Sequence, residues 1–70
     1  MTAQGLREGI RNGLDRMEIE QLEALIGRKL DTLPKSKLRI LYLVVVNLEL
    51  RDLALIKGAF DTLSNFARDI

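Results

Sequence analysis

The run Ile40-Leu41-Tyr42-Leu43-Val44-Val45-Val46 is unbroken by any polar residue, and it decides how the chain must fold. The chain has only 70 residues, of which 47% are hydrophobic, and it contains no cysteine. A domain of this size buries only about 60% of the surface that its unfolded chain exposes. Without disulfides, small domains commonly gain cover for their apolar residues by oligomerisation. We therefore expect a single small helical domain, residues 1–70, that is completed by a second copy or by another partner.

The apolar run is predicted to be a helix that is buried on nearly all sides. Helical spacing places the apolar residues in and around the run on two faces. One face carries Leu38, Leu41, Val45 and Leu48, and the other carries Leu43, Val46, Leu50 and Leu53. The three consecutive valines also suit a strand, because β-branched residues pack well in sheets. A single strand cannot make a sheet alone, so this alternative requires pairing with another chain.

The first segment is predicted to be a weak helix. Leu6, Ile10 and Leu14 lie on one ridge, and glycines at 5, 9 and 13 follow the same spacing one position earlier. Each interior glycine costs a helix about 1 kcal/mol relative to alanine. The helix should therefore form only when something packs on it, which is either a partner or the rest of the same domain.

The segments on either side of the apolar run also read as helices. Asp15 and Glu18 have the spacing of a capping box, which predicts the start of the second helix. Leu33-Pro34 should end this helix, because proline disfavours the helical conformation in the residue before it. A later stripe comprises Leu53, Ile56, Phe60, Leu63 and Ala67. The third and fourth helices either form one helix with a kink between residues 47 and 52 or are separate, with Asp52 capping the fourth.

These patterns predict an all-α fold, a small bundle of three to four helices at about residues 2–14, 16–31, 35–49 and 51–68. Because the apolar faces exceed what one short chain should cover, oligomerisation is expected, with a dimer favoured. The predicted interface comprises Leu43, Val46, Leu50, Leu53, Phe60, Leu6 and Ile10.

The residue types disfavour catalysis and cofactor binding. The chain has no histidine and no cysteine, so Ser36 and Ser64 have no histidine base. Glu20 and Glu23 are close enough in sequence to share a metal ion, but acids near a helix start are also explained by the helix dipole. We therefore expect no enzyme, no cofactor and no metal site. The predicted function is that of a small non-enzymatic regulatory or adaptor protein acting through protein–protein contacts; a structural subunit of a larger assembly is a further alternative.

A second function stays open because the charges are unevenly placed. The net charge is only +1, but basic residues cluster between positions 28 and 39. Such a block can attract phosphate or an acidic partner. The candidate binding residues are Arg28, Lys29, Lys35, Lys37 and Arg39.

Part of the chain resembles the helix-turn-helix of sigma-factor region 4. The residues that carry the resemblance are Leu33-Pro34, Ile40-Leu41, Leu43, Leu48, Asp52-Leu53-Ala54 and Gly58. The resemblance implies a turn at Gly58 and a recognition helix from Phe60 to Ile70, hence a DNA- or RNA-binding regulator. The sequence departs from the family pattern at Leu38 and Lys57, and Asp61 and Asp69 are unfavourable beside phosphate.

Neither a membrane span nor a signal peptide is expected. A spanning helix needs about 20 consecutive apolar residues, and Arg39, Asn47 and Glu49 interrupt the stretch around the apolar run. Arg7 and Glu8 occupy positions where a signal peptide would be apolar. The absence of cysteine suits a reducing compartment, so we expect a cytoplasmic protein.

Overall fold

The computed structural model describes the backbone of residues 1–68 and the side chains of residues 1–66, and this part of the chain contains helices and no strand. The elements are α1 (Ala3–Gly13), α2 (Arg16–Ile26), the 3₁₀ turn η1 (Leu30–Thr32), α3 (Lys35–Tyr42), the π-helical segment η2 (Leu43–Asn47) and α4 (Leu53–Arg68). The all-α helical bundle is therefore confirmed. The strand alternative for the three valines is wrong, because they lie in η2. Asp69 and Ile70 lie outside the described residues.

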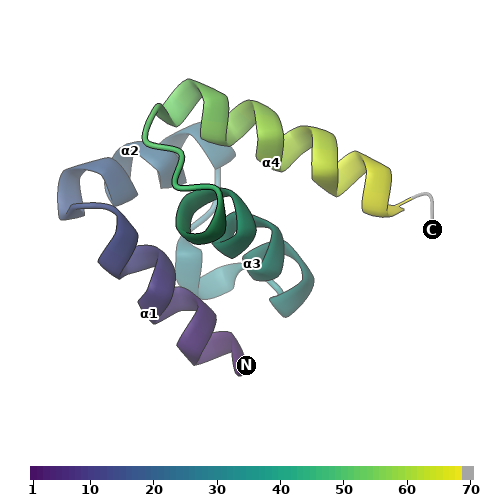
Figure 1. Cartoon of the computed structure of the whole chain (residues 1–70), viewed down its shortest axis with the longest axis horizontal. Coiled ribbons are helices and arrows are strands. Elements are labelled where there is room, and N and C mark those ends of the chain that lie inside the picture. Colours follow the sequence, from purple (N-terminus) through teal and green to yellow (C-terminus); the bar gives the residue numbers. More distant parts are fainter. Residues whose placement is uncertain (69–70) are drawn as a thin grey trace.

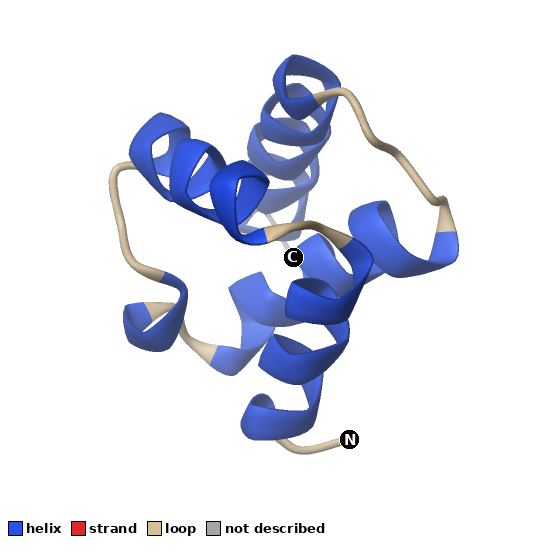
Figure 2. Cartoon of the chain, turned by 90° about the vertical axis from the view of Figure 1, so that its left-hand side faces the viewer, coloured by secondary structure: helices blue, strands red, loops and turns tan. Residues whose placement is uncertain are grey.

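Helix α3 lies at the centre of the bundle. In Figure 1, α1 packs below α3 and α4 above it, and α2 lies at the left, with its end behind the first turns of α4; Figure 2 shows the same arrangement from the left-hand side. Leu41, Val44 and Val45 of the apolar run are fully buried in the core. Of the other four residues of the run, Leu43 is exposed and the remaining three are half-buried. One chain therefore covers the run only in part, and the expectation that a second chain completes this cover stays a prediction.

The glycines of α1 explain how this helix packs on its own domain. Gly9 lies against the ring of Tyr42, and a Cβ added at Gly13 would come within 3.1 Å of Val45 Cγ1. Glycine at these positions lets α1 approach α3 and η2 closely. The Thr2 hydroxyl accepts a hydrogen bond from Gly5 N at 3.0 Å, which caps the start of the helix.

Helix α2 begins as predicted but ends earlier. Asp15 and Glu18 form the predicted capping box, with hydrogen bonds of 2.8 and 3.0 Å. The helix ends at Ile26, because Gly27 adopts a left-handed conformation with φ 82°. A glycine at this position is a common helix stop. The predicted extension of this helix to residue 31 is therefore wrong, and η1 occupies part of that segment.

The third helix ends in an irregular way. Leu48 N donates to Leu43 O at 2.9 Å across five residues, which is the π-helical pattern, and Leu50 N donates to Val44 O at 3.2 Å. In the connection that follows, Glu49 adopts a left-handed backbone conformation with φ 54°. The Arg51 guanidinium donates to Val45 O at 3.1 Å, so that one of the last carbonyls of the segment is capped.

The fourth helix is separate from the third. The carboxylate of Asp52 accepts hydrogen bonds from Ala54 N at 2.9 Å and from Leu55 N at 3.2 Å. This is N-capping of the kind expected for an aspartate before a helix. The prediction that Asp52 caps a separate fourth helix is confirmed, and the alternative of one continuous helix is wrong.

Candidate functional site

Three residues of the predicted interface lie in the core of the single chain. Leu6 and Ile10 of α1 and Phe60 of α4 are buried against the other helices. Their side chains are already covered within one chain, so they offer no open contact surface. This part of the predicted interface is wrong, because the chain packs α1 and α4 onto its own α3.

The remaining residues of the predicted interface differ in their exposure to solvent. Leu43, at the start of η2, is 40% exposed. Val46, Leu50 and Leu53 are half-buried and pack against the core. The stripe predicted through these four residues therefore packs mostly against the core of its own chain. Among the four, Leu43 alone keeps substantial exposed apolar surface.

A more open apolar surface lies on the outer side of α4. Leu55 and Phe66 are 60% and 68% exposed. They share one side of the helix with Ala59 and Thr62, because steps of four, three and four residues return to the same side of a helix. We call this stripe of Leu55, Ala59, Thr62 and Phe66 the α4 face.

The α4 face carries no charged side chain. The exposed neighbouring positions Ala54, Gly58 and Asn65 are uncharged as well. Lys57 and Asp61 form an ion pair with each other, and helical spacing places both away from the α4 face. Another apolar surface could therefore cover the α4 face without burying an unpaired charge.

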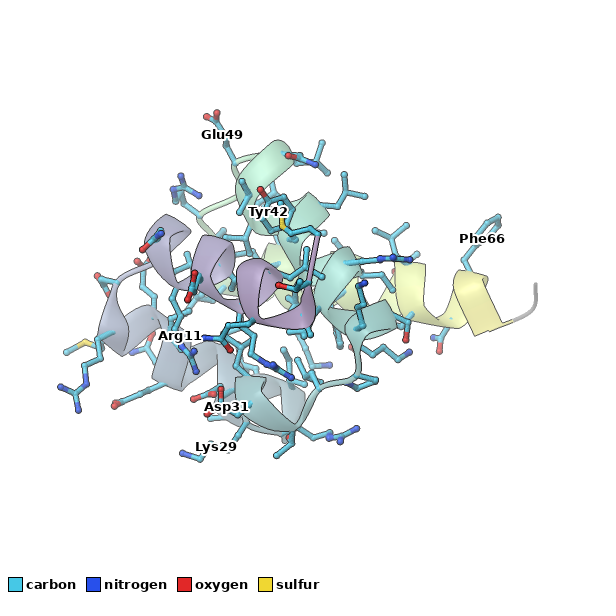
Figure 3. The ribbon with its side chains drawn as sticks, turned by 90° about the horizontal axis from the view of Figure 1, so that it is seen from below. Arg11, Lys29, Asp31, Tyr42, Glu49 and Phe66 are labelled. Atoms are coloured by element: carbon cyan, nitrogen blue, oxygen red, sulfur yellow. The ribbon has the colours of Figure 1, made fainter. Side chains whose placement is uncertain are left out.

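The C-terminal part of α4 projects beyond the rest of the bundle (Figure 1). Figure 3 shows Phe66 at this projecting end, with its ring pointing toward the same side of the molecule as Glu49 and far from the other labelled residues. The most exposed aromatic side chain among the described residues therefore lies at the projecting end of α4.

Sequence reasoning missed Leu55 and Phe66 as surface candidates. The stronger apolar stripe of α4, which includes Ile56 and Phe60, is the side that faces the core. The spacing of the α4 face was readable in the sequence, but its two central positions are alanine and threonine. A stripe with small residues at its centre gives a weak hydrophobic signal, so the buried stripe dominated the prediction.

The basic block is distributed over two segments. Arg28 and Lys29 follow α2, and the Arg28 guanidinium donates to Thr32 O at 2.7 Å. Lys35 and Arg39 of α3 are exposed, and Lys37 is half-buried. Part of this block therefore stabilises the connection around η1, whereas Lys29, Lys35 and Arg39 remain open to solvent.

The implied helix-turn-helix is absent from the described residues. Gly58 lies inside α4, which runs without a break from Leu53 to Arg68. A recognition helix that begins at Phe60 would need a turn at Gly58. The resemblance to sigma-factor region 4 therefore does not hold at its turn, and Asp69 and Ile70 of the implied recognition helix lie outside the described residues.

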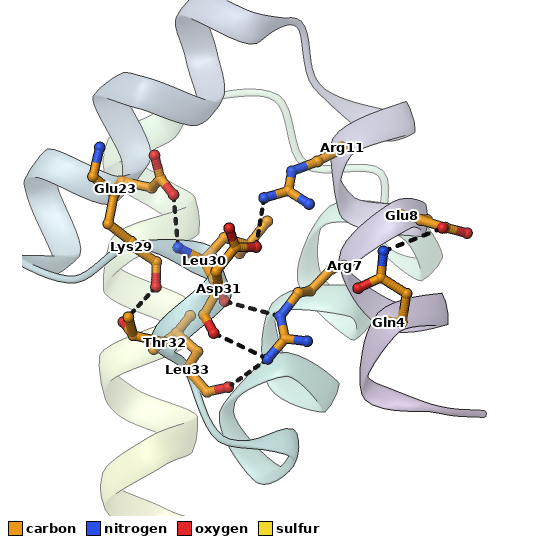
Figure 4. Close-up of polar contacts among 10 residues, drawn as sticks. All are labelled: Gln4, Arg7, Glu8, Arg11, Glu23, Lys29, Leu30, Asp31, Thr32 and Leu33. Atoms are coloured by element: carbon orange, nitrogen blue, oxygen red, sulfur yellow. Dashed lines mark hydrogen bonds and ion pairs between the residues drawn. The ribbon is translucent and has the colours of Figure 1, made fainter.

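A polar cluster joins α1 to η1 (Figure 4). The Arg7 guanidinium donates to Leu30 O at 3.2 Å and to Asp31 O and Leu33 O at 3.3 Å. The Arg11 guanidinium donates to Asp31 Oδ1 at 2.8 Å. This hydrogen bond and the positive charge of Arg11 lower the pKa of Asp31 below its ordinary value. The cluster is explained by its role in fixing η1 on α1.

The acidic residues of α2 have structural partners. Glu23 Oε2 accepts a hydrogen bond from Leu30 N at 2.6 Å, and Glu20 lies 3.8 Å from Arg16 Nε. Both glutamates line two shallow grooves of about 430 and 310 Å³, whose walls also carry Arg11, Arg16, Arg28 and Lys29. Within the described residues, no group of three or more potential metal ligands occurs.

Comparisons of the chain with protein-family models, with curated proteins and with solved structures gave no match. No helix within residues 1–68 has both the length and the apolar character needed to cross a bilayer.

Proposed function

We propose that this chain is a small non-enzymatic protein of a regulatory or adaptor kind, which acts by binding another protein chain through the α4 face. The observation that supports the proposal is the uncharged stripe that ends in Phe66, in which Leu55, Thr62 and Phe66 are exposed and only Ala59 is half-buried. Aromatic residues are enriched in protein interfaces, whereas charged residues are depleted from their centres. The lack of cysteine suits a cytoplasmic setting for this activity.

The energetics set the strength of the expected contact. Full burial of a leucine or phenylalanine side chain contributes about 1.5–3 kcal/mol, so burial of the exposed parts of Leu55 and Phe66 should contribute roughly 3 kcal/mol together. Association itself costs at least about 4 kcal/mol in lost motional freedom. The partner must therefore also contact residues around the stripe, and a weak, reversible complex is expected.

Affinity capture with the purified chain tests the proposal. We would compare the wild type with the double variant Leu55→Ser/Phe66→Ser. Because both side chains are exposed, each change should alter stability by no more than about 0.5 kcal/mol, which urea unfolding would check. We expect the wild type to capture a protein with micromolar affinity. The double variant should no longer capture this protein.

Met17→Ser is the matched control, because Met17 is 67% exposed on α2 and lies outside the α4 face. This variant should bind as the wild type does. Equal binding by the wild type and the double variant would contradict the proposal. So would a wild-type chain that binds no protein and stays monomeric at several hundred micromolar.

Nucleic-acid binding through the basic block is the alternative function. The exposure of Lys29, Lys35 and Arg39 supports it, although no helix-turn-helix within residues 1–68 presents these side chains. Phosphate contacts make such binding strongly dependent on salt. A binding assay at two salt concentrations, with and without Lys35→Glu, tests this alternative. It is contradicted if the chain does not bind at low salt or if Lys35→Glu has no effect.

A further inference from the structure

We propose that the partner of the α4 face is the α4 face of a second copy of this chain, packed antiparallel about a twofold axis. This inference rests on the proposed protein-binding function and names the partner that the geometry of the surface fits. The axis would pass near the middle of the stripe, between the positions of Ala59 and Thr62.

The spacing of the α4 face is the same in both directions along the helix. A twofold interface uses the same patch on both chains, so the patch must be complementary to itself. The steps of four, three and four residues meet this condition. When two such helices run antiparallel, Leu55 of one chain lies opposite Phe66 of the other, and Ala59 lies opposite Thr62. The same alternation of three and four residues forms the seam of paired helices in coiled coils.

The sizes of the side chains fit this pairing as well. The small residues Ala59 and Thr62 lie at the centre, where two crossing helices come closest; Thr62 is exposed, and Ala59 is half-buried beside the core of its own chain. The large residues Leu55 and Phe66 lie at the two ends, where each would cover the other across the pair. Gly58 supports the same arrangement, because it is exposed and a Cβ there would meet nothing within 4 Å. Packing within one chain therefore gives no reason for this interior glycine, whereas a closely approaching helix does.

Electrostatics favours an identical, antiparallel partner. Because the α4 face is uncharged, pairing it with itself buries no unpaired charge. The Lys57–Asp61 ion pair lies away from the stripe and stays intact. Antiparallel packing also places the positive end of each helix dipole near the negative end of the other, whereas parallel packing places like ends together.

The size of the surface predicts a weak dimer. Stable complexes bury about 800 Å² on each partner, which is roughly a sixth of the 4575 Å² accessible surface of this chain. One face of a helix of 16 residues is only about 24 Å long at 1.5 Å per residue. We therefore expect dissociation in the micromolar range.

Engineered cysteines provide a direct test, because the chain contains none of its own. A disulfide forms only when the two Cα atoms lie about 4.4–6.8 Å apart. Leu55→Cys and Phe66→Cys chains, when mixed and oxidised, should form the mixed disulfide. Neither variant should cross-link efficiently to itself, because the two copies of each position would lie about 16 Å apart along the paired helices. Efficient self-linking of either variant, or no mixed disulfide, would overturn the proposal.

Sedimentation equilibrium of the unmodified chain tests the dimer without cysteines. Phe66→Ser should weaken dimerisation at least tenfold, whereas Met17→Ser should leave it unchanged. A dimer that is insensitive to Phe66→Ser would overturn antiparallel α4 pairing, and so would a chain that stays monomeric at several hundred micromolar. The proposed function would survive either result if a different protein were still captured through the α4 face. It would fail separately if no captured protein depended on that face.

Discussion

The ring of Tyr42 in α3 lies directly against Gly9 in α1, so closely that a Cβ at position 9 would overlap the ring edge. Val45 approaches Gly13 one turn further along α1, at 3.1 Å from the place where a Cβ would be. The glycines that weaken α1 as an isolated helix are therefore the positions through which it packs on the centre of the domain.

We expect Gly9→Ala to destabilise the protein. Alanine improves helix propensity by about 1 kcal/mol, but overpacking against a ring typically costs about 1–3 kcal/mol. The net loss in the free energy of unfolding should be about 1 kcal/mol, measured by urea denaturation. The double variant Gly9→Ala/Tyr42→Leu should recover part of this loss, because the ring that causes the overlap is gone.

Gly58→Ala is the control for this prediction. Gly58 is also inside a helix, but a Cβ there would meet nothing within 4 Å. In the monomer, propensity alone should then act and raise stability by about 1 kcal/mol, measured at a concentration too low for the proposed dimer to form. If both substitutions changed stability in the same direction, close packing of Gly9 on Tyr42 would not be what distinguishes the two positions.

The helices could be predicted from the sequence because local signals define them. The capping box of Asp15 and Glu18 and the N-cap at Asp52 each satisfy backbone groups within a few residues, so the pattern can be read without knowledge of the fold. The division of α4 into a buried side and an exposed side could not be read in this way. It depends on which stripe the neighbouring helices cover, and that is a property of tertiary packing.

Glu49→Gly should stabilise the protein. Glu49 adopts φ 54°, a left-handed conformation that costs a non-glycine residue about 1–2 kcal/mol. Glycine has no Cβ and avoids most of this cost, although it loses more chain entropy on folding. We expect a gain of about 1 kcal/mol in urea denaturation. Gly27→Ala is the converse control, because Gly27 has φ 82° and alanine should lower stability there. Unchanged stability in Glu49→Gly would contradict the strain at Glu49.

The irregular end of the third helix could not be predicted from the sequence. No residue type specifies the five-residue hydrogen bond from Leu48 N to Leu43 O, and the left-handed turn falls on a glutamate rather than on a glycine. The sequence therefore lacked the usual glycine marker of a helix end. The end of the third helix therefore depends on tertiary packing and has no marker in the local sequence.

Ser64→Ala should leave stability unchanged or raise it by up to about 1 kcal/mol. The Ser64 hydroxyl is buried in α4 and has no hydrogen-bond partner among the described residues. A buried hydroxyl without a partner opposes folding, and alanine removes it while favouring the helix. Thermal unfolding followed by circular dichroism would measure the change. A clear loss of stability would show that the hydroxyl has a favourable contact in solution.

The Arg11–Asp31 ion pair should make stability depend on pH on the acid side. The hydrogen bond from Arg11 lowers the pKa of Asp31 in the folded protein, so folding favours the charged carboxylate. The contribution is present above the ordinary pKa of 3.8 and is lost as pH falls through the lower, folded-state pKa. An NMR titration of the Asp31 carboxyl carbon should show its pKa rising toward the ordinary value in Arg11→Gln. Because the pair is exposed, high salt should reduce the difference between the two proteins. An identical Asp31 pKa in both proteins would contradict this account.

Arg7→Lys should destabilise the protein although it keeps the charge. The planar guanidinium of Arg7 donates to the carbonyls of Leu30, Asp31 and Leu33 from two nitrogens, and these bonds hold η1 on α1. A lysine ammonium is a single point donor and cannot reproduce this fork. Because a net hydrogen bond contributes about 0.5–1.5 kcal/mol, we expect a loss of about 1–2 kcal/mol in urea denaturation. Faster hydrogen exchange at η1 should accompany the loss. The matched control is Arg16→Lys, because the Arg16 side chain is 95% exposed. This substitution should change stability little. Equal effects of the two substitutions would show that the carbonyl contacts of Arg7 contribute nothing to stability.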